Sequence, residues 1–158
     1  MRVADRIGRA RSAAELAAVA GLFRAYAATL PFDLGFQDFE TELATLPGKY
    51  AAPRGALLYA RDGDGPAGCV AMRPLGGGIC EMKRLYVTGA ARGTGLGRAL
   101  VAAVLDAAER AGHREMRLDT LPSMPGALAL YRAAGFEVIP PYYETPVAGT
   151  IFLSRPLA

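Results

Sequence analysis

Hydrophobic and polar positions follow two different periods along the chain. Four segments have apolar residues at every third or fourth position, as helices do: residues 12–30, 37–46, 95–111 and 123–134. Six shorter runs are rich in apolar residues and bounded by turn-forming residues, as strands are: residues 55–61, 66–74, 79–87, 115–121, 136–139 and 148–154. This order predicts two helices, an antiparallel run, a βαβ unit, and then a helix and a hairpin.

Residues at the segment boundaries support these assignments. Ser12 and Glu15 have the spacing of a capping box, and Pro31 ends the first helix. The first two strands flank the turn Asp62-Gly63-Asp64-Gly65, and the next hairpin turns on the three glycines at 76–78. Two strands joined by a loop and a helix imply a right-handed parallel crossover. The predicted fold is therefore α+β, with a sheet split between antiparallel and parallel parts.

Length and composition indicate one globular domain. The chain has 158 residues, so we expect residues 1–158 to form a single domain. Hydrophobic residues make up 52% of the chain, which is enough for a core and excludes a disordered protein. The first twelve residues lack the apolar core of a signal peptide, and no window reaches about 18 consecutive apolar residues. We therefore expect no membrane association.

Charge and cysteine content exclude further classes of function. The net charge is +3, and no dense basic stripe with interleaved aromatic residues is present, so nucleic-acid binding is not expected. One histidine and two cysteines give no metal-ligand spacing. In the predicted hairpin Cys80 faces a residue near Arg73 and not Cys69, so no disulfide is expected. A reducing, cytoplasmic location follows as the expectation.

A glycine-rich loop joins the strand at 79–87 to the following helix. Such a loop leaves backbone N–H groups free to bind an anion, and the helix dipole and nearby arginines (Arg84, Arg92 and Arg98) add positive potential. The spacing does not match a dinucleotide fingerprint, because Arg98 occupies the place of the third glycine. It does not match a P-loop either, because counting from Gly89 places Thr94 at the second glycine. The remaining pattern is Arg92-x-x-Gly95-x-Gly97.

This pattern resembles the acetyl-CoA signature of the GCN5-related N-acetyltransferase (GNAT) superfamily. The stretch ALALYRAAGF at 127–136 is similar to the late helix motif of the same family. The resemblance covers roughly residues 66–137. It implies a mixed, mostly antiparallel sheet of six to seven strands with a central parallel splayed pair, flanked by about four helices. It also implies acetyl-CoA as cofactor, with CoA as product.

The resemblance assigns cofactor-binding residues. The backbone of Leu85, Tyr86 and Val87 would bind the pantetheine arm, and the N–H near Val87 would hold the thioester carbonyl. The glycine loop would bind the pyrophosphate through Arg92, Gly93, Thr94, Gly95, Leu96, Gly97 and Arg98. Many relatives have an asparagine that contacts the cofactor where this chain has Met124. A thioether cannot replace an amide, so this contact is lost or taken over by Ser123.

Two side chains are candidates for proton transfer. The resemblance assigns Tyr131 as the proton donor to the departing CoA thiolate. Glu81 lies eleven residues before Arg92, the offset at which some protein-acetylating relatives place a catalytic glutamate. Desolvation within a sheet would raise its pKa and suit it to accept the proton of the amine, directly or through water. The alternative is an ion pair of Glu81 with Arg73, Lys83 or Arg84, and the sequence leaves both open.

Several other residues are expected near the acetyl acceptor. The connection after the first helix (Phe32, Asp33 and Phe36) and the tail (Tyr142, Tyr143 and Glu144) would suit a small cationic or amino-bearing acceptor. Alternatively, the cations Arg73, Lys83 and Arg84 would bind an acceptor carboxylate. Asp119 and Thr120 either shape the cleft or cap the next helix, and His113 is expected on the surface.

The function predicted from these residues is an acetyl-CoA-dependent N-acetyltransferase. Its acceptor is expected to be a primary amine of a small molecule, attacked directly in a ternary complex. Met124 motivates one alternative, a non-catalytic CoA-binding sensor or partner module. The Glu81 spacing motivates another, acetylation of a protein or peptide lysine or N-terminus. Apolar strands in the tail leave a homodimer open.

Overall fold

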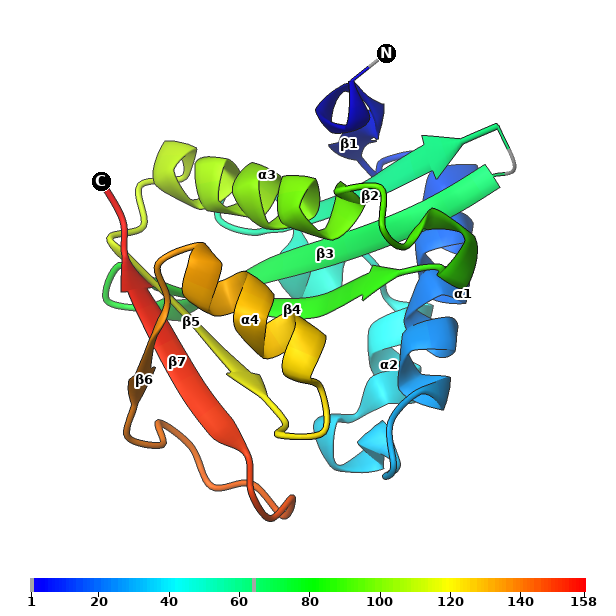
Figure 1. The fold of residues 1–158 in the computed structure, drawn as a ribbon. Coiled ribbons are helices and arrows are strands. Elements are labelled where there is room, and N and C mark those ends of the chain that lie inside the picture. The colour runs from blue at the N-terminus through cyan, green and yellow to red at the C-terminus, as the bar shows by residue number, and fades with distance from the viewer. Residues whose placement is uncertain (1, 64) are drawn as a thin grey trace.

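One sheet of seven strands organises the protein (Figure 1). The computed structural model describes residues 2–63 and 65–158, so Asp64 of the predicted turn lies outside the described residues. The strand order is β1-β2-β3-β4-β5-β7-β6, with bounds Ile7–Arg9 (β1), Ala56–Asp62 (β2), Gly65–Gly76 (β3), Ile79–Val87 (β4), Glu115–Thr120 (β5), Glu137–Ile139 (β6) and Ile151–Pro156 (β7). The β4–β5 pair is parallel and the other neighbouring pairs are antiparallel. The predicted mixed sheet with a central parallel pair is confirmed.

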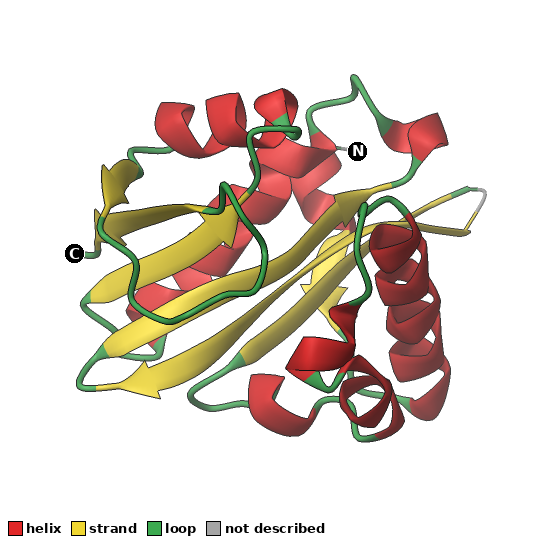
Figure 2. Ribbon diagram, turned by 90° about the horizontal axis from the view of Figure 1, so that it is seen from below, coloured by secondary structure: helices red, strands yellow, loops and turns green. Residues whose placement is uncertain are grey.

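Helices cover both faces of this sheet (Figure 2). In the described residues the α-helices are α1 (Ala13–Ala28), α2 (Phe39–Ala44), α3 (Leu96–Arg110) and α4 (Pro125–Ala133). Short 3-10 helices are η1 (Val3–Arg6), η2 (Leu34–Gln37), η3 (Gly48–Tyr50) and η4 (Gly89–Ala91). Helices α3 and α4 lie on one face, and α1 and α2 lie on the other (Figure 1). Each face therefore has its own hydrophobic core.

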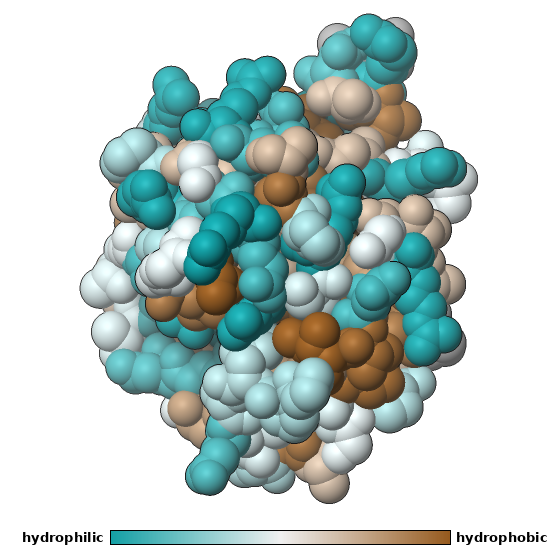
Figure 3. Space-filling view, turned by 90° about the vertical axis from the view of Figure 1, so that its left-hand side faces the viewer, coloured by the Kyte–Doolittle hydropathy of each residue, from teal (hydrophilic) through white to brown (hydrophobic). Residues whose placement is uncertain are grey.

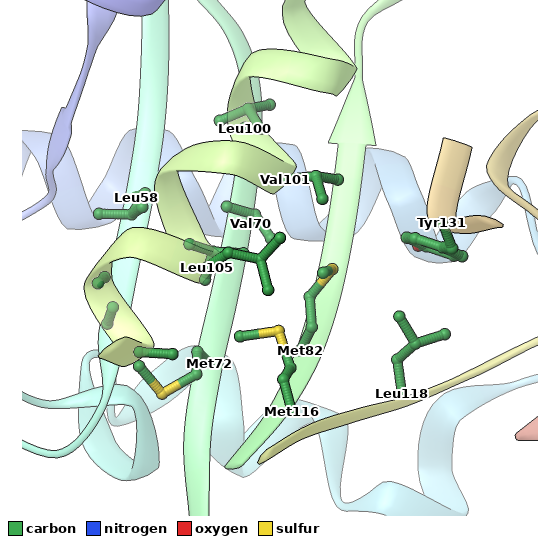
Figure 4. Packing of buried hydrophobic residues seen from close by; sticks show 14 of the residues in the cluster. Leu58, Val70, Met72, Met82, Leu100, Val101, Leu105, Met116, Leu118 and Tyr131 are labelled. Carbon is green, nitrogen blue, oxygen red and sulfur yellow. The ribbon is translucent and has the colours of Figure 1, made fainter. Parts of the chain in front are cut away.

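The two cores follow from the alternation of side chains along the strands. On β5 every second residue is buried, and Met116 and Leu118 point into the core under α3 and α4 (Figure 4). Tyr131 of α4 lies at the rim of this core, beside Leu118 (Figure 4). The second core packs Phe23 of α1 against Leu57 and other residues on the opposite face. The rim position of Tyr131 places it between a core and the site described below.

Most predicted boundaries agree with the structure to within a few residues. The capping box is present, because the N–H of Glu15 donates to Ser12 Oγ at 3.1 Å and the N–H of Ser12 donates to Glu15 Oε1 at 2.9 Å. The hairpin glycines at 76–78 all have positive φ, as their turn requires. Cys80 stands opposite Pro74 and Cys69 opposite Tyr86, so the expected hairpin register is confirmed and the two thiols are free.

Three local predictions were wrong or incomplete. The helix predicted at 37–46 is divided into η2 and α2, because Asp38 has a left-handed conformation (φ 55°) that no continuous helix can include. The three-residue strand β1 has no clear sequence pattern and was not predicted. His113 is buried rather than on the surface, and its Nε2–H donates to the carbonyl oxygen of Arg54 at 2.8 Å.

Strand β6 forms one edge of the sheet. Its Val138 is 58% exposed. The face seen in Figure 3, which includes the side of β6 and β7, has small hydrophobic patches set among hydrophilic side chains. Among the helices of the described residues, none is both long and apolar enough to cross a bilayer. A homodimer stays a prediction.

Candidate active site

The parallel strands β4 and β5 separate soon after they begin. They pair only from Ile79 with Glu115 to Glu81 with Arg117. Beyond this point the edge of β4 that faces β5 has no strand partner, although its other edge remains paired with β3. Unpaired backbone N–H and C=O groups are available there to a ligand that lies along the strand. The predicted splayed pair is thus present, and it opens a gap through the sheet.

A β-bulge accompanies this separation. Cys69 of β3 pairs with Tyr86 and Ala71 pairs with Lys83, so two residues of β4 stand opposite Val70. Arg84 is one of them, and it has a positive φ of 62°, which is uncommon for a residue other than glycine. The bulge bends β4 where the gap opens.

Buried polar contacts hold Arg84 in this conformation. Its Nε and Nη2 donate to the two oxygens of Glu42 on α2, each at 3.0 Å, and Nη2 also donates to Gln37 Oε1 at 2.9 Å. Both charged side chains are 3% exposed. The expectation that Arg84 adds positive potential at the glycine loop is therefore wrong, because its charge is neutralised against α2.

A cavity of about 720 Å³ passes through the gap. Residues 82–87 of β4 form one wall, and the glycine loop and α4 form the cofactor side. The other side is lined by the end of α1, the segment that follows it, and the tail between β6 and β7. The volume lies within the range of about 300–1,000 Å³ that small-molecule sites occupy. One continuous space therefore joins both faces of the sheet.

The glycine loop presents free backbone donors to this cavity. Gly93 and Gly95 have positive φ values of 77° and 86°. The first intrahelical bond of α3 in this region runs from the N–H of Ala99 to the carbonyl of Gly95 at 3.0 Å, so the preceding N–H groups have no helical partner. Gly95 is the N-cap and has no side chain that could accept from them. Such an arrangement fits a pyrophosphate group.

Most of the predicted cofactor-binding residues line the cavity: Leu85, Tyr86, Val87, Arg92, Gly93, Gly95, Leu96, Gly97 and Met124. Thr94 and Arg98 do not. The Thr94 hydroxyl donates to the carbonyl of Ala91 at 2.6 Å, and Arg98 lines a separate groove beside α3 and α4. A Cβ added to Gly97 would lie 3.4 Å from Leu130 of α4, so glycine here lets the two helices approach. The roles of these residues stay predictions.

The start of α4 contributes Ser123 and Met124 to the cavity wall. No side chain caps this helix, so Asp119 and Thr120 do not act as its cap. Both instead line the cavity, which supports the alternative that they shape the cleft. Among the described residues, the Ser123 side chain makes no hydrogen bond, so nothing in the structure shows it taking over the contact of the missing asparagine.

Tyr131 lines the cavity from α4 and is 7% exposed. Burial raises the pKa of its phenol, and the nearby Tyr26 and Asp119 raise it further. Its hydroxyl makes no hydrogen bond to any described residue and is not sealed from the cavity. The group is therefore protonated at neutral pH and available to a ligand.

Glu81 lies outside the cavity lining and is 2% exposed. Arg73 Nε donates to its Oε1 at 2.8 Å and the Tyr142 hydroxyl donates to its Oε2 at 2.6 Å. Burial would raise its pKa, but Lys83, Tyr142 and Arg73 together hold the pKa below its usual value. The expected rise is thus wrong. The expected ion pair is present with Arg73, and the Lys83 ammonium lies 3.9 Å away.

The acceptor side agrees in part with the sequence. Phe32, Phe36 and Tyr143 line the cavity. The other three candidates do not: Asp33 accepts from the N–H of Gly35, Tyr142 points to Glu81, and Glu144 is absent from the lining. Residues that sequence reasoning did not place here include Tyr26, Thr29, Leu30, Gln37, Thr145, Val147 and Thr150. No sequence motif marks them, because the tail and α1 meet only in the folded chain.

Lys83 and Asp119 lie on the acceptor side of the gap. Each is two residues beyond the last β4–β5 pair, so they stand level across the opening. Asp119 Oδ2 accepts from the Tyr143 hydroxyl. Burial lowers the pKa of Lys83 to about 8, although Glu81 and Asp119 oppose this shift. A cation and an anion therefore flank the point where the two halves of the cavity meet.

Known proteins resemble this chain in sequence and in fold. The chain matches the Acetyltransferase (GNAT) family over residues 19–136. An uncharacterized N-acetyltransferase of Schizosaccharomyces pombe is 42% identical over 134 residues, covering 84% of this chain and 82% of the relative. A GCN5-related N-acetyltransferase structure from Kribbella flavida has a TM-score of 0.72 and 24% identity, covering 97% and 99%. A Salmonella typhimurium protein solved with its cofactor acetyl-CoA has a TM-score of 0.74 and 18% identity, covering 96% and 93%.

Proposed function

The chain belongs to the GNAT family of acetyltransferases, and we propose that it moves an acetyl group from acetyl-CoA to a primary amine of a small molecule. One observation carries this proposal. A single cavity joins the glycine loop, the free edge of β4 and Tyr131 to an acceptor side on the opposite face of the sheet. Both substrates can therefore be bound at once, as direct attack in a ternary complex requires.

The acceptor side favours a small molecule over a protein segment. Tyr143, Thr145 and Val147 of the tail line it together with Phe32 and Phe36. An extended peptide needs a groove along which its backbone can pair, whereas this site is a cavity of about 720 Å³, within the range of small-molecule sites. The structural relative solved with acetyl-CoA supports that cofactor for this chain.

When bound, acetyl-CoA supplies the thioester carbonyl that the amine attacks. We infer that the free β4 N–H near Val87 donates to the carbonyl oxygen, where negative charge develops. Asp119 is the only carboxylate among the described residues that line the cavity, and we assign it, directly or through water, to accept the proton of the amine. Glu81 is not assigned this role, because its oxygens are already bound by Arg73 and Tyr142.

Tyr131 donates the proton that the departing sulfur requires. An ordinary thiol titrates near about 8.5, and burial raises the pKa of Tyr131 above its usual value. Full transfer from the phenol is therefore uphill. The proton that Asp119 takes from the attacking nitrogen replaces the one that the phenol gives to sulfur, through solvent at the cavity mouth. A neutral amine therefore reacts with no net release of protons, and an acceptor that enters as an ammonium ion releases one.

An acetyl-CoA thiol-release assay over amines, amino acids, aminoglycosides and peptides tests the function. With an active acceptor, Tyr131→Phe is expected to lower kcat by about a hundredfold or more, as loss of a general acid does, and to leave the KM for acetyl-CoA unchanged. Tyr59→Phe is the matched control, because the Tyr59 hydroxyl is bonded to Glu15 outside the cavity. Wild-type turnover by Tyr131→Phe would remove the acid assignment.

The alternative of a CoA-binding module without catalysis gives a different result in the same assay. Tight binding of acetyl-CoA with no thiol release over the whole panel would favour it. The Met124 substitution motivates this alternative, yet Met124 lines the cavity beside residues that fit the cofactor.

A further inference from the structure

Lys83 is the one cation on the acceptor side whose charge the described residues leave without a hydrogen bond. Its side chain is 10% exposed, and it lines the cavity. The nearest carboxylate oxygen, Glu81 Oε1, is 3.9 Å from Nζ, beyond hydrogen-bond distance. A buried ammonium normally needs partners for its donors, because desolvation is costly. The structure supplies none close enough.

The nearby carboxylates accept hydrogen bonds from other groups and none from Lys83. Arg73 and Tyr142 occupy the two oxygens of Glu81. The Tyr143 hydroxyl binds Asp119. The neighbouring cation Arg84 also lines the cavity, but its charge is already paired with Glu42, so it attracts an anion in the cavity less than Lys83 does. The Lys83 ammonium is therefore the group on this side that is free to bind one.

The charges around Lys83 define which anion fits. Glu81 and Asp119 repel negative charge, and both act electrostatically on Lys83. A dianion such as a phosphate monoester would face two carboxylates with one ammonium. A carboxylate carries a single charge and can accept from two donors of the ammonium. A monoanionic carboxylate is thus the better match.

Asp119 supplies a negative charge opposite the positive charge of Lys83. It stands level with Lys83 across the opening between β4 and β5, and it lines the same cavity as Tyr131. A carboxylate at this position attracts an ammonium group and can then accept its proton. A ligand with both charges would bind Lys83 with one end and present its nitrogen to the thioester with the other.

We propose that the acetyl acceptor is a small amino-carboxylate, with its carboxylate on the Lys83 ammonium and its amino group on the Asp119 side of the gap. This inference rests on the proposed transferase function and names its substrate class. Phe32, Phe36 and Tyr143 then surround the carbon skeleton between the two charged ends.

The test compares acceptors that differ only in the carboxylate. Glycine, L-phenylalanine, β-alanine and γ-aminobutyrate are each assayed beside the corresponding carboxamide, by thiol release from acetyl-CoA. Converting the carboxylate to a carboxamide also changes the pKa of the acceptor's amine. The deciding quantity is therefore how much Lys83→Met changes kcat/KM for each acceptor of a pair. This substitution is expected to lower kcat/KM for the preferred amino-carboxylate by about ten- to a hundredfold, as loss of a charge-assisted bond does. It should leave kcat/KM for the carboxamide unchanged.

Two variants serve as controls. Lys49→Met removes the only other lysine, which pairs with Glu42 outside the cavity, and should leave both acceptors unaffected. Lys83→Arg retains the charge and should restore part of the preference. Thermal unfolding checks that each variant is folded, and Lys83→Gln makes the same comparison if Lys83→Met is not.

The remaining outcomes separate the two proposals. If Lys83→Met lowers turnover of acid and amide equally, or changes neither, the amino-carboxylate assignment is wrong while the transferase function stands. If wild type binds acetyl-CoA but releases thiol with no amine of any class, the transferase function itself is wrong, and this inference fails with it.

Discussion

Lys83 and Arg84 are neighbours on β4, yet the fold treats their positive charges in opposite ways. Arg84 makes three hydrogen bonds to Glu42 and Gln37, which pair its charge between β4 and α2. Lys83 is buried nearly as deeply, but its ammonium lies 3.9 Å from the nearest carboxylate and lines the cavity. We call the first the closed ion pair and the second the open ammonium.

This difference distinguishes a charged residue that stabilises the fold from one that can bind a ligand. The charge of a closed ion pair is already balanced within the protein, and its contribution is to hold α2 on the bulge of β4. An open ammonium retains its donors, and a ligand can satisfy them where the protein does not. Burial of a charged group alone therefore does not mark a binding residue. A buried charged group is a candidate for ligand binding when the protein leaves its hydrogen-bond donors without partners.

The largest expected effect comes from breaking the closed ion pair. Glu42→Ala leaves Arg84 as a buried charge without its carboxylate, and such a loss costs about 3–5 kcal/mol. It also releases the positive φ of Arg84, which the pair holds in place. We expect urea unfolding to show this decrease in the free energy of unfolding.

The matched control for that substitution is Glu40→Ala. Glu40 lies on the same helix and pairs with Arg24, but the two side chains are 77% and 60% exposed. An exposed pair contributes about 0–1 kcal/mol. Equal losses from Glu42→Ala and Glu40→Ala would show that the closed ion pair does not stabilise the bulge.

The contrast between these neighbours could not be predicted from the sequence. Local patterns located six of the seven described strands, the glycine loop and the parallel crossover, because these depend on residues close in the chain. The bulge at Arg84 depends on the register between β3 and β4, and the partner of Arg84 comes from a helix 42 residues away. Sequence analysis therefore placed Arg84 at the glycine loop.

One side of the candidate site could be predicted from the sequence and the other could not. The cofactor side is built from one continuous stretch and α4, so its motifs were recognisable. The acceptor side brings together β4, β5, the end of α1 and a tail that is distant in sequence. Glu81 shows the consequence, because its partner Tyr142 is 61 residues away and no spacing rule connects the two.

A second prediction uses pH to distinguish the open ammonium from a permanent charge. Burial lowers the pKa of Lys83 from 10.5 to about 8, with Arg84 and Lys49 adding to the shift and Glu81 and Asp119 opposing it. In the free enzyme Lys83 is charged below that pH and neutral above it. Arginine stays charged throughout. The ratio of kcat/KM between wild type and Lys83→Arg, for the same amino-carboxylate, should thus be constant below about pH 8 and fall about tenfold per unit above it.

Titration of the acceptor amine is common to both enzymes and cancels in this ratio. A pH profile of kcat/KM for each enzyme measures it directly. A ratio that does not change between pH 7 and pH 10 would contradict binding of the acceptor by the Lys83 ammonium.

The smallest expected effect comes from a substitution that lets the open ammonium pair with a carboxylate of the protein. Tyr142→Phe keeps the ring that packs on Tyr143 and Phe152 but removes the hydroxyl that binds Glu81 Oε2. The freed oxygen can then accept from Lys83, and the acceptor carboxylate has to compete with it.

We therefore expect Tyr142→Phe to lower kcat/KM for the amino-carboxylate by about two- to tenfold, the equivalent of one net hydrogen bond, and to leave the carboxamide unaffected. Tyr59→Phe removes a hydroxyl that likewise donates to a carboxylate, Glu15 at 3.1 Å, and should change neither acceptor. Steady-state kinetics with both acceptors measures the effect. A rise for the amino-carboxylate would mean that Tyr142 hinders the acceptor directly. The expected decrease would instead show that the Tyr142 hydroxyl, by binding Glu81, keeps Glu81 from pairing with Lys83.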